Sequence, residues 1–180
     1  AAWERQSYLR ARLTHFDKEF NEQVHLACLE RGISPEDKLE LIQIREQLIK
    51  PNSGGYNLKY SHGGLLEIEF AAQIFCLSHQ LLPSGSSTSD LFWSIEKSHK
   101  EVRDLTQNLT AAYRFLRQAE QFLTLVSGSS THNLVRGSET SFRLAQIMKT
   151  DESSLCDRIE ATLSNASTWV KQLDPIFSPS

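Results

Sequence analysis

Apolar residues recur at spacings of three and four along nearly the whole chain, which is the period of a helix with one buried face. The clearest apolar stripe consists of Leu109, Ala112, Tyr113, Leu116, Ala119 and Leu123. No segment alternates between apolar and polar residues as a half-buried strand would. The pattern predicts helices over 3–31, 35–50, 64–82, 90–104, 106–126, 139–149 and 152–173.

Turn-forming residues separate these helices. Gly32 is expected to end the first helix, and Ser34-Pro35 has the form of a cap followed by a first-turn proline. The segments 51–64 and 83–90 are loops by their content of glycine, serine and proline. About seven helices joined by short loops predict an all-α multi-helix bundle, with a single helical domain over residues 1–180.

Composition narrows the class of protein. The chain has 180 residues, of which 39% are hydrophobic and 23% charged, as in an ordinary globular domain. Its net charge of −3 and its short apolar runs lead us to expect neither nucleic acid nor a membrane among its partners. Cys28, Cys76 and Cys156 stand alone, which favours a reducing cytoplasm and argues against a disulfide framework or a zinc site.

Common catalytic motifs do not occur in the sequence. There is no phosphate-binding loop, no nucleophile elbow and no paired-histidine zinc motif. The six histidines lack ligand spacing, so we expect surface or partly buried side chains. The segment Gly85–Asp90 resembles the Gly-Ser…Asp motif of nucleotidyltransferases, but those enzymes need two acids on neighbouring strands to hold two magnesium ions. We interpret it as a linker with Asp90 capping a helix, and we predict no catalytic residue and no metal ligand in this chain.

Two glutamates stand out in the apolar segment 59–77, KYSHGGLLEIEFAAQIFCL. Glu67 and Glu69 are two residues apart, hence about 200° apart around a helix, so they cannot share one ligand. Glu67 is expected at the third helical position after Gly64, where it caps the helix by reaching back to a free backbone N–H. Glu69 forms a narrow polar stripe with Gln73. That stripe is either a buried brace to a cation or a surface facing a ligand or another domain.

Several neighbouring residues are candidates for nucleotide binding or for a domain interface. The arginines of the first predicted helix have three interpretations: partners of Glu69, surface charges, or contacts to a phosphate. The glycine pair is either a tight turn or a place where backbone amides approach a phosphate at a helix start. The candidate set is Lys59, Gly63, Gly64, Glu69, Gln73, Arg5, Arg10 and Arg12.

Three segments together resemble a known family. The segments are AWERQSYLRAR at Ala2–Arg12, LKYSHGGLLEIEFAAQ at Leu58–Gln73 and LTAAYRFLRQAEQFLTL at Leu109–Leu125. In order and spacing they are similar to the elements WERQALLRAR, K-x-G-x-G-G-[IL]-x-[DE]-I-E-F-x-x-Q and L-x-x-A-Y-x-F-L-R-x-x-E of bacterial glutamine synthetase adenylyltransferases. The similarity covers essentially the whole chain. Ser61 departs from the family by replacing a usual Gly, and Glu67 stands where Asp is commoner.

The resemblance implies a function that the residues alone do not indicate. Enzymes of this family have two nucleotidyltransferase halves, each with a mixed α/β core followed by a helical bundle. One half transfers AMP from ATP to a tyrosine of glutamine synthetase, and the other removes it by phosphorolysis; glutamine and a PII signalling protein set the direction. This chain would be one bundle and inactive alone, because the catalytic acids, magnesium and ATP belong to a core that precedes it. The implied partners are that core, glutamine synthetase and PII.

The two ends of the sequence suggest a piece of a larger protein. The first residues have full helical character without a cap, and the chain closes on LDPIFSPS. We expect a fragment from the carboxyl-terminal, adenylylating half. The alternatives are a non-catalytic docking or regulatory module that binds glutamine synthetase or PII, and the helical region of a PII uridylyltransferase.

Overall fold

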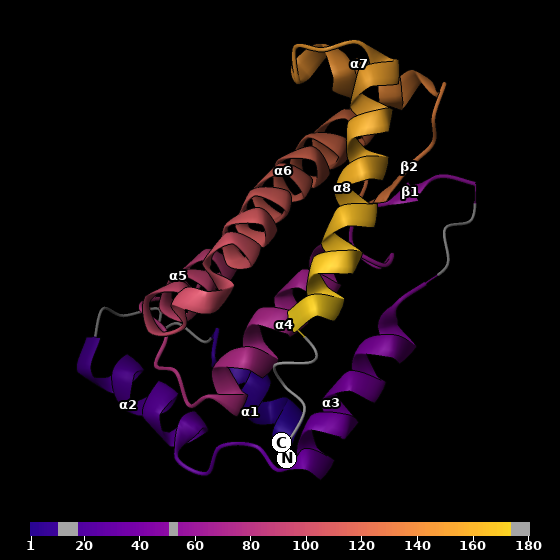
Figure 1. The fold of residues 1–180 in the computed structure, drawn as a ribbon. Coiled ribbons are helices and arrows are strands. Elements are labelled where there is room, and N and C mark those ends of the chain that lie inside the picture. Colours follow the sequence, from indigo (N-terminus) through magenta and orange to yellow (C-terminus); the bar gives the residue numbers. More distant parts are fainter. Residues whose placement is uncertain (11–17, 51–53, 174–180) are drawn as a thin grey trace. The chain divides into compact units, whose positions relative to one another are not determined.

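Most of the described residues form helices and only four lie in strands, which confirms the predicted all-α class. The structure, a computed structural model, describes residues 1–10, 18–50 and 54–173. The helices are α1 (Ala2–Tyr8), α2 (Lys18–Leu29), α3 (Pro35–Leu48), α4 (Leu65–Ser78), α5 (Thr88–Ser98), α6 (Arg103–Ser127), α7 (Glu139–Ile147) and α8 (Glu152–Leu173), with a 3-10 turn, η1 (Lys100–Val102), before α6 (Figure 1).

The chain divides into two compact units. Among the described residues, unit 1 comprises those within 1–46 and 69–107 together with Leu173, and unit 2 comprises those within 47–68 and 108–172. Each unit has its own fully buried apolar residues. Those of unit 1 include Leu9, Leu41, Ile74, Phe75, Leu91, Phe92 and Ile95, and those of unit 2 include Leu58, Leu65, Ile68, Leu109, Leu116, Leu123, Leu134 and Ile159. The single-domain organisation stays a prediction.

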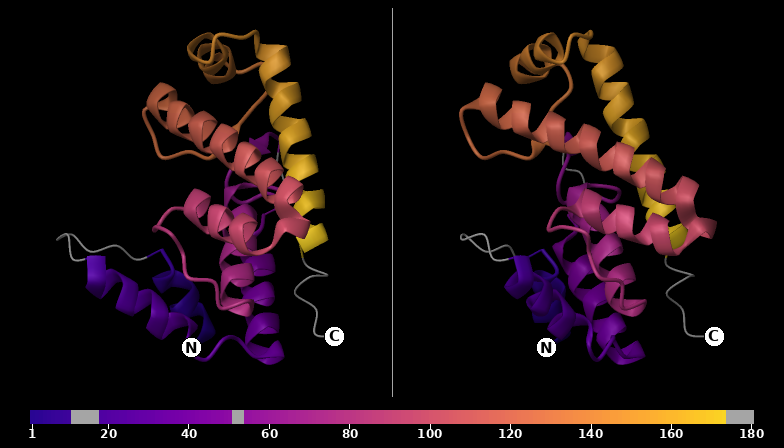
Figure 2. Two further views of the ribbon diagram at one scale, coloured as in Figure 1. Left: turned by 60° about the vertical axis from the view of Figure 1, so that its left-hand side comes forward. Right: turned by 90° about the vertical axis from the view of Figure 1, so that its left-hand side faces the viewer.

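In unit 1 the predicted helix 3–31 is not continuous. Helix α1 ends at Tyr8, and Leu9 and Arg10 form a turn. Helices α1 and α2 lie against each other, which one straight helix does not permit (Figure 2). Leu9 is completely buried at this turn. Packing between the two helices therefore overrides the helical periodicity, as tertiary contacts commonly do. Residues 11–17 lie outside the described ranges.

Helix α4 is the most apolar helix of the chain, and it is buried on nearly all sides. Ile68, Ala71, Phe75 and Leu77 are all completely buried, so no single stripe faces a core. Glu67 and Glu69 are therefore polar groups in an apolar helix, and each needs a partner. None of the helices in residues 1–10, 18–50 and 54–173 is long and apolar enough to cross a membrane.

Side chains cap the starts of α3 and α5. At α5, the Ser87 hydroxyl accepts the Asp90 N–H at 3.1 Å, and the Asp90 carboxylate accepts the Ser87 N–H at 3.0 Å. This reciprocal pair is a capping box in which Ser87 is the N-cap and Asp90 is the third helical residue, so Asp90 takes part in the cap but α5 begins at Thr88, before the predicted start at Asp90. At α3, the Ser34 hydroxyl accepts the Asp37 N–H at 3.1 Å.

Unit 2 contains α6, α7, α8 and a small sheet that the sequence pattern did not predict. Helix α7 lies beside the end of α6 and the start of α8 (Figures 1 and 2). Strands β1 (Tyr56–Asn57) and β2 (Asn133–Leu134) pair in antiparallel fashion, with Tyr56 opposite Leu134. Two residues are too few to show alternation, so only the long-range pairing reveals these strands.

Candidate functional site

The polar stripe of α4 contacts the first helix and the turn after it. Glu69 forms an ion pair with Arg10, with 2.9 Å between Oε2 and Nη1. Gln73 accepts a hydrogen bond of 2.9 Å from the buried side-chain amide of Gln6. These four residues, which we name the Arg10–Glu69 cluster, border an open cavity of about 420 Å³ together with Ser7 and Phe70. The structure thus brings together three predicted site residues, Arg10, Glu69 and Gln73.

The other predicted cations do not all join Glu69. Arg5 donates at 3.0 Å to the Asp37 carboxylate at the start of α3, and its second nitrogen donates to the Gly32 carbonyl. Arg5 therefore ties α1 to the turn between α2 and α3. Lys59 lies with its Nζ 5.1 Å from the centre of the Tyr60 ring, a cation–π contact. Arg12 lies outside the described residues.

The glycine pair has a structural reason at the start of α4. Gly63 has a φ of +71°, and a Cβ there would lie 1.8 Å from the Leu163 carbonyl oxygen of α8. A Cβ on Gly64 would lie 2.8 Å from the Ser61 carbonyl oxygen. Both positions therefore require a residue without a side chain.

The amides at this helix start already have acceptors. The Gly63 N–H donates to the carboxylate of Glu67, which is only 2% exposed. The following amides donate to backbone carbonyls: Gly64 to Ser61 at 2.9 Å, Leu65 to Leu58 at 3.0 Å and Leu66 to Lys59 at 3.0 Å. A phosphate at this position would have to displace these bonds, so the geometry favours the turn over the phosphate-binding interpretation. Glu67, the third residue of α4, accepts the N–H of Gly63, two residues before the helix begins.

Ser61 has its own role in this turn. Its side chain is buried, and its hydroxyl donates to the Asn57 carbonyl at 2.5 Å. Asn57 in turn accepts the N–H groups of Lys59 and Tyr60 at 3.1 and 2.8 Å. The serine that replaces the family's usual glycine is thus accommodated by a hydrogen bond that closes the loop from β1 to α4.

A second polar cluster lies in unit 2, and we did not single out its residues from the sequence. Arg117 donates to the Glu120 carboxylate at 2.7 Å and to the Tyr113 hydroxyl at 3.0 Å. His132 Nδ1 lies 2.9 Å from the other Glu120 oxygen, and its ring meets Tyr60 edge-on at 5.5 Å. We name Tyr113, Arg117, Glu120 and His132 the Glu120 cluster. The sequence did contain a signal for this cluster: the A-Y-x-F-L-R-x-x-E element has three polar positions, and they are Tyr113, Arg117 and Glu120.

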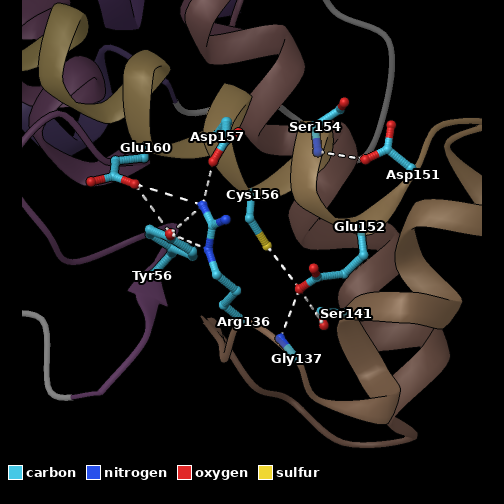
Figure 3. Close-up of polar contacts among 10 residues, drawn as sticks. All are labelled: Tyr56, Arg136, Gly137, Ser141, Asp151, Glu152, Ser154, Cys156, Asp157 and Glu160. Carbon is cyan, nitrogen blue, oxygen red and sulfur yellow. Dashed lines mark hydrogen bonds and ion pairs between the residues drawn. The ribbon is translucent and has the colours of Figure 1, made fainter.

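A third cluster, on the surface of unit 2, ties β1 and the segment after β2 to α7 and α8 (Figure 3). Arg136 donates to Asp157 at 2.5 Å and to the Tyr56 hydroxyl at 3.1 Å, and Tyr56 donates to Glu160 at 3.2 Å. Beside it, one oxygen of Glu152 accepts from three donors: the Gly137 N–H at 2.7 Å, the Ser141 hydroxyl at 3.0 Å and the Cys156 thiol at 3.3 Å.

These contacts change the proton affinities of the groups involved. The Gly137 N–H is the main cause that lowers the pKa of Glu152. Burial and the neighbouring Glu152 carboxylate raise the pKa of the Cys156 thiol to about 11, so this thiol stays protonated at neutral pH. This part of unit 2 is a structural connection rather than a reactive site.

In the described ranges, the cysteines are free and the histidines belong to no cluster of metal ligands. Cys28, Cys76 and Cys156 are free and buried. In residues 1–10, 18–50 and 54–173, no three His, Cys, Asp or Glu side chains are arranged to hold a metal ion.

Comparison with known proteins places the chain in a family. The family model described as "GlnD PII-uridylyltransferase" matches residues 36–177, well over half of the sequence. The chain therefore belongs to the GlnD PII-uridylyltransferase family. This match includes the start of α4 and the Glu120 cluster, whereas Arg5 and Arg10 precede it.

Curated relatives of this GlnD-family chain confirm the resemblance noted from the three motifs. Three bacterial relatives each carry the name bifunctional glutamine synthetase adenylyltransferase/adenylyl-removing enzyme. The one from Ralstonia nicotianae is 36% identical over 99 residues, covering 51% of this chain and 10% of its own length. The one from Psychromonas ingrahamii is 32% identical over 136 residues, which cover 68% of this chain. The one from Mycobacterium bovis is 32% identical over 142 residues, which cover 73% of this chain. The chain covers only 14% of the length of these two relatives.

Proposed function

We propose that this chain is the helical domain of a nucleotidyltransferase that transfers AMP from ATP to glutamine synthetase and also removes it. The observation that carries the proposal is the alignment with adenylyltransferases over 68–73% of the chain, joined to the three motifs in order. The catalytic acids, magnesium and ATP would belong to a nucleotidyltransferase core of the same polypeptide. On this proposal the enzyme is cytoplasmic, its activity responds to a PII protein, and the isolated chain is inactive.

Within that enzyme, the Arg10–Glu69 cluster is proposed to border the core. Its charged and amide groups line an open cavity, and Arg10 is 32% exposed. Helix α1 also presents Trp3 and Tyr8, which are each about half exposed. Aromatic side chains and arginine are enriched where protein surfaces meet, and contacts between domains resemble such interfaces. Arg10 and Glu69 would then position the helical domain against the nucleotide cleft.

Substitution of Glu69 separates a cleft role from a purely stabilising role. Glu69→Gln removes the charge and keeps the size, and a partly exposed ion pair contributes about 1 kcal/mol or less to stability. In the full-length enzyme we expect normal folding with at least about a tenfold loss of kcat. Arg5→Gln is the matched control, because Arg5 pairs with Asp37 away from Glu69. Full activity of Glu69→Gln, or a loss fully explained by unfolding, contradicts the cleft role.

The proposed activity is tested by substrate exchange on the full-length enzyme. Labelled ATP with glutamine synthetase should give a labelled adenylylated product, and the isolated chain should give none. The name of the matching family supports one other candidate, uridylyl transfer to a PII protein. Labelled UTP with PII is therefore the second arm. Transfer in that arm alone would replace the adenylyltransferase proposal, and AMP transfer by the isolated chain would refute the assignment of catalysis to a separate core.

A further inference from the structure

Unit 2 carries a second open cavity, of about 490 Å³, that none of the clusters above uses. It lies where α6, the end of α7 and α8 meet. Four apolar side chains form one part of its lining, and three cations surround that part. The apolar residues are Phe115, Phe122, Ile147 and Met148, and the cations are Arg114, Lys149 and Arg158.

The charge of this cavity contrasts with that of the chain. The net charge of the protein is −3, yet no carboxylate lines the cavity. Within the part of the chain that the structure describes, no ion pair involves Arg114, Lys149 or Arg158. Asp151, the nearest acid in sequence to Lys149, accepts the Ser154 N–H at 2.8 Å as the cap of α8. The cavity therefore keeps an uncompensated positive field.

Two of the cations are held in defined positions. The Arg158 guanidinium lies 4.1 Å from the centre of the Phe115 ring, which orients it across the apolar part of the cavity. Lys149 has a φ of +56°, in the left-handed region that glycine usually occupies at helix ends. A lysine there costs about 1 kcal/mol of backbone strain relative to glycine. Such strain beside a cavity is a reason to look for a function.

From this arrangement we propose that the cavity docks an acidic, amphipathic helical segment of a partner protein. Carboxylates of the segment would pair with Arg114, Lys149 and Arg158, and its apolar side chains would cover Phe122, Ile147 and Met148. On α6 the lining runs from Ala111 to Phe122, about 16 Å or three helical turns. Leu125, one turn further, is 72% exposed and extends the apolar surface. This length fits a helix in a groove.

Other occupants fit the surface less well. Arg114, Lys149 and Arg158 come from three different elements and surround an apolar surface instead of converging on one point, as a small phosphate would require. Permanent interfaces are depleted of charge at their centre, whereas charge complementarity speeds reversible encounters. The cations therefore favour a partner that binds and dissociates over a fixed part of the same protein.

Met148 offers a direct test, because it is the only methionine of the chain. Its methyl group, labelled with carbon-13, gives an NMR signal that reports on the cavity. The probe is a 16-residue amphipathic helical peptide with glutamate on its polar face and leucine and phenylalanine on the other. We expect saturable binding to the chain with a shift of the Met148 signal. The same peptide with glutamine in place of glutamate should bind at least about tenfold more weakly.

Three variants of the chain complete the test. Arg114→Glu should weaken peptide binding at least about tenfold, and Lys171→Glu, an exposed reversal on α8 outside the cavity lining, should leave it unchanged. Lys149→Gly removes a cation and suits the positive φ, so it should weaken binding while the chain stays as stable or becomes more stable. That combination excludes misfolding as the cause.

Four results would overturn the proposal. The first is an unshifted Met148 signal, and the second is equal binding of the glutamate and glutamine peptides. The third is a shift of the same signal by inorganic pyrophosphate or anionic lipid vesicles at lower concentration than the peptide, which would indicate a phosphate or membrane site. The fourth is self-association of the chain that competes with the peptide, which would assign the surface to a second copy.

Discussion

Gly63 is the position where a single methyl group should disturb unit 2 most. Its φ of +71° is one that side chains rarely adopt, and an added Cβ would lie 1.8 Å from the Leu163 carbonyl oxygen and 2.9 Å from the Ser167 nitrogen. Both atoms belong to the backbone of α8, which cannot rotate away as a side chain can. Gly63→Ala must therefore push the start of α4 and the middle of α8 apart by about 1.2 Å to reach 3.0 Å.

The expected cost has two parts. The left-handed conformation costs alanine about 1–2 kcal/mol, of which about 0.4–1 kcal/mol is offset because alanine restricts the unfolded chain. Forcing two packed backbones apart adds about 1–3 kcal/mol, as other overpacked sites do. The Gly63 N–H bond to the buried Glu67 carboxylate lies at the same place and would be strained as well. We expect Gly63→Ala to lower the free energy of unfolding by about 2–4 kcal/mol.

Urea unfolding of the chain measures this value, and Gly128 supplies the control. Gly128 has a similar φ of +64°, but a Cβ there meets nothing within 4 Å. Gly128→Ala therefore bears only the conformational cost, and we expect a loss of about 1 kcal/mol or less. The difference between the two variants isolates the contact with α8. A difference below about 0.5 kcal/mol would show that this close approach is not rigid, and the reasoning would fail.

Three further predictions concern other polar groups. Glu67→Ala leaves the Gly63 N–H without its buried acceptor and should lower the free energy of unfolding in urea by about 1–3 kcal/mol. Glu67→Gln keeps an acceptor oxygen and should lower it less. Equal losses for the two variants would contradict the capping role. Burial and the neighbouring His99 lower the pKa of His79, so the unfolded chain binds more protons below pH 6.5 and stability should fall as the pH drops from 7.5 to 5.5. His79→Phe keeps the ring contact with Phe75 and should reduce that fall, and an unchanged pH dependence would exclude His79 as its source. Because the pKa of Cys156 is raised to about 11 and the side chain is buried, iodoacetamide at pH 8 should modify this thiol only after unfolding, as mass spectrometry would reveal; rapid modification of the folded chain would contradict this.

Local pattern was sufficient for most helices of this chain. The predicted segments 35–50, 139–149 and 152–173 agree with α3, α7 and α8 within a few residues, since each is bounded by its own cap or breaker. At α5 the sequence indicated a cap at Asp90, whereas the N-cap is Ser87 and Asp90 completes the capping box three residues later. Local signals failed at Leu9 and Arg10, where packing of α1 against α2 replaces one long helix by two.

The candidate site was predictable only as a set of residues that needed partners. The apolar surroundings of Glu69 and Gln73 indicated that some cation and some polar group must meet them. Which ones did so depended on how α1 and the turn after it pack: Gln6 contacts Gln73, Arg10 contacts Glu69, and Arg5 contacts Asp37 instead. The Glu120 cluster was missed because the spacing of α6 showed its apolar stripe, and the contact with His132 joins residues outside any local pattern.

By itself, the sequence determined the all-α class, the caps and, through its motifs, the family. Those features depend on residues within one or two helical turns of each other, or on the order of short segments. The tertiary structure alone decided the pair formed by Arg10 and Glu69, the β1–β2 ladder and the cationic cavity around Met148. Each of these needs segments far apart in the chain to meet, and the free energy that brings them together comes from packing of whole faces, which no local pattern records.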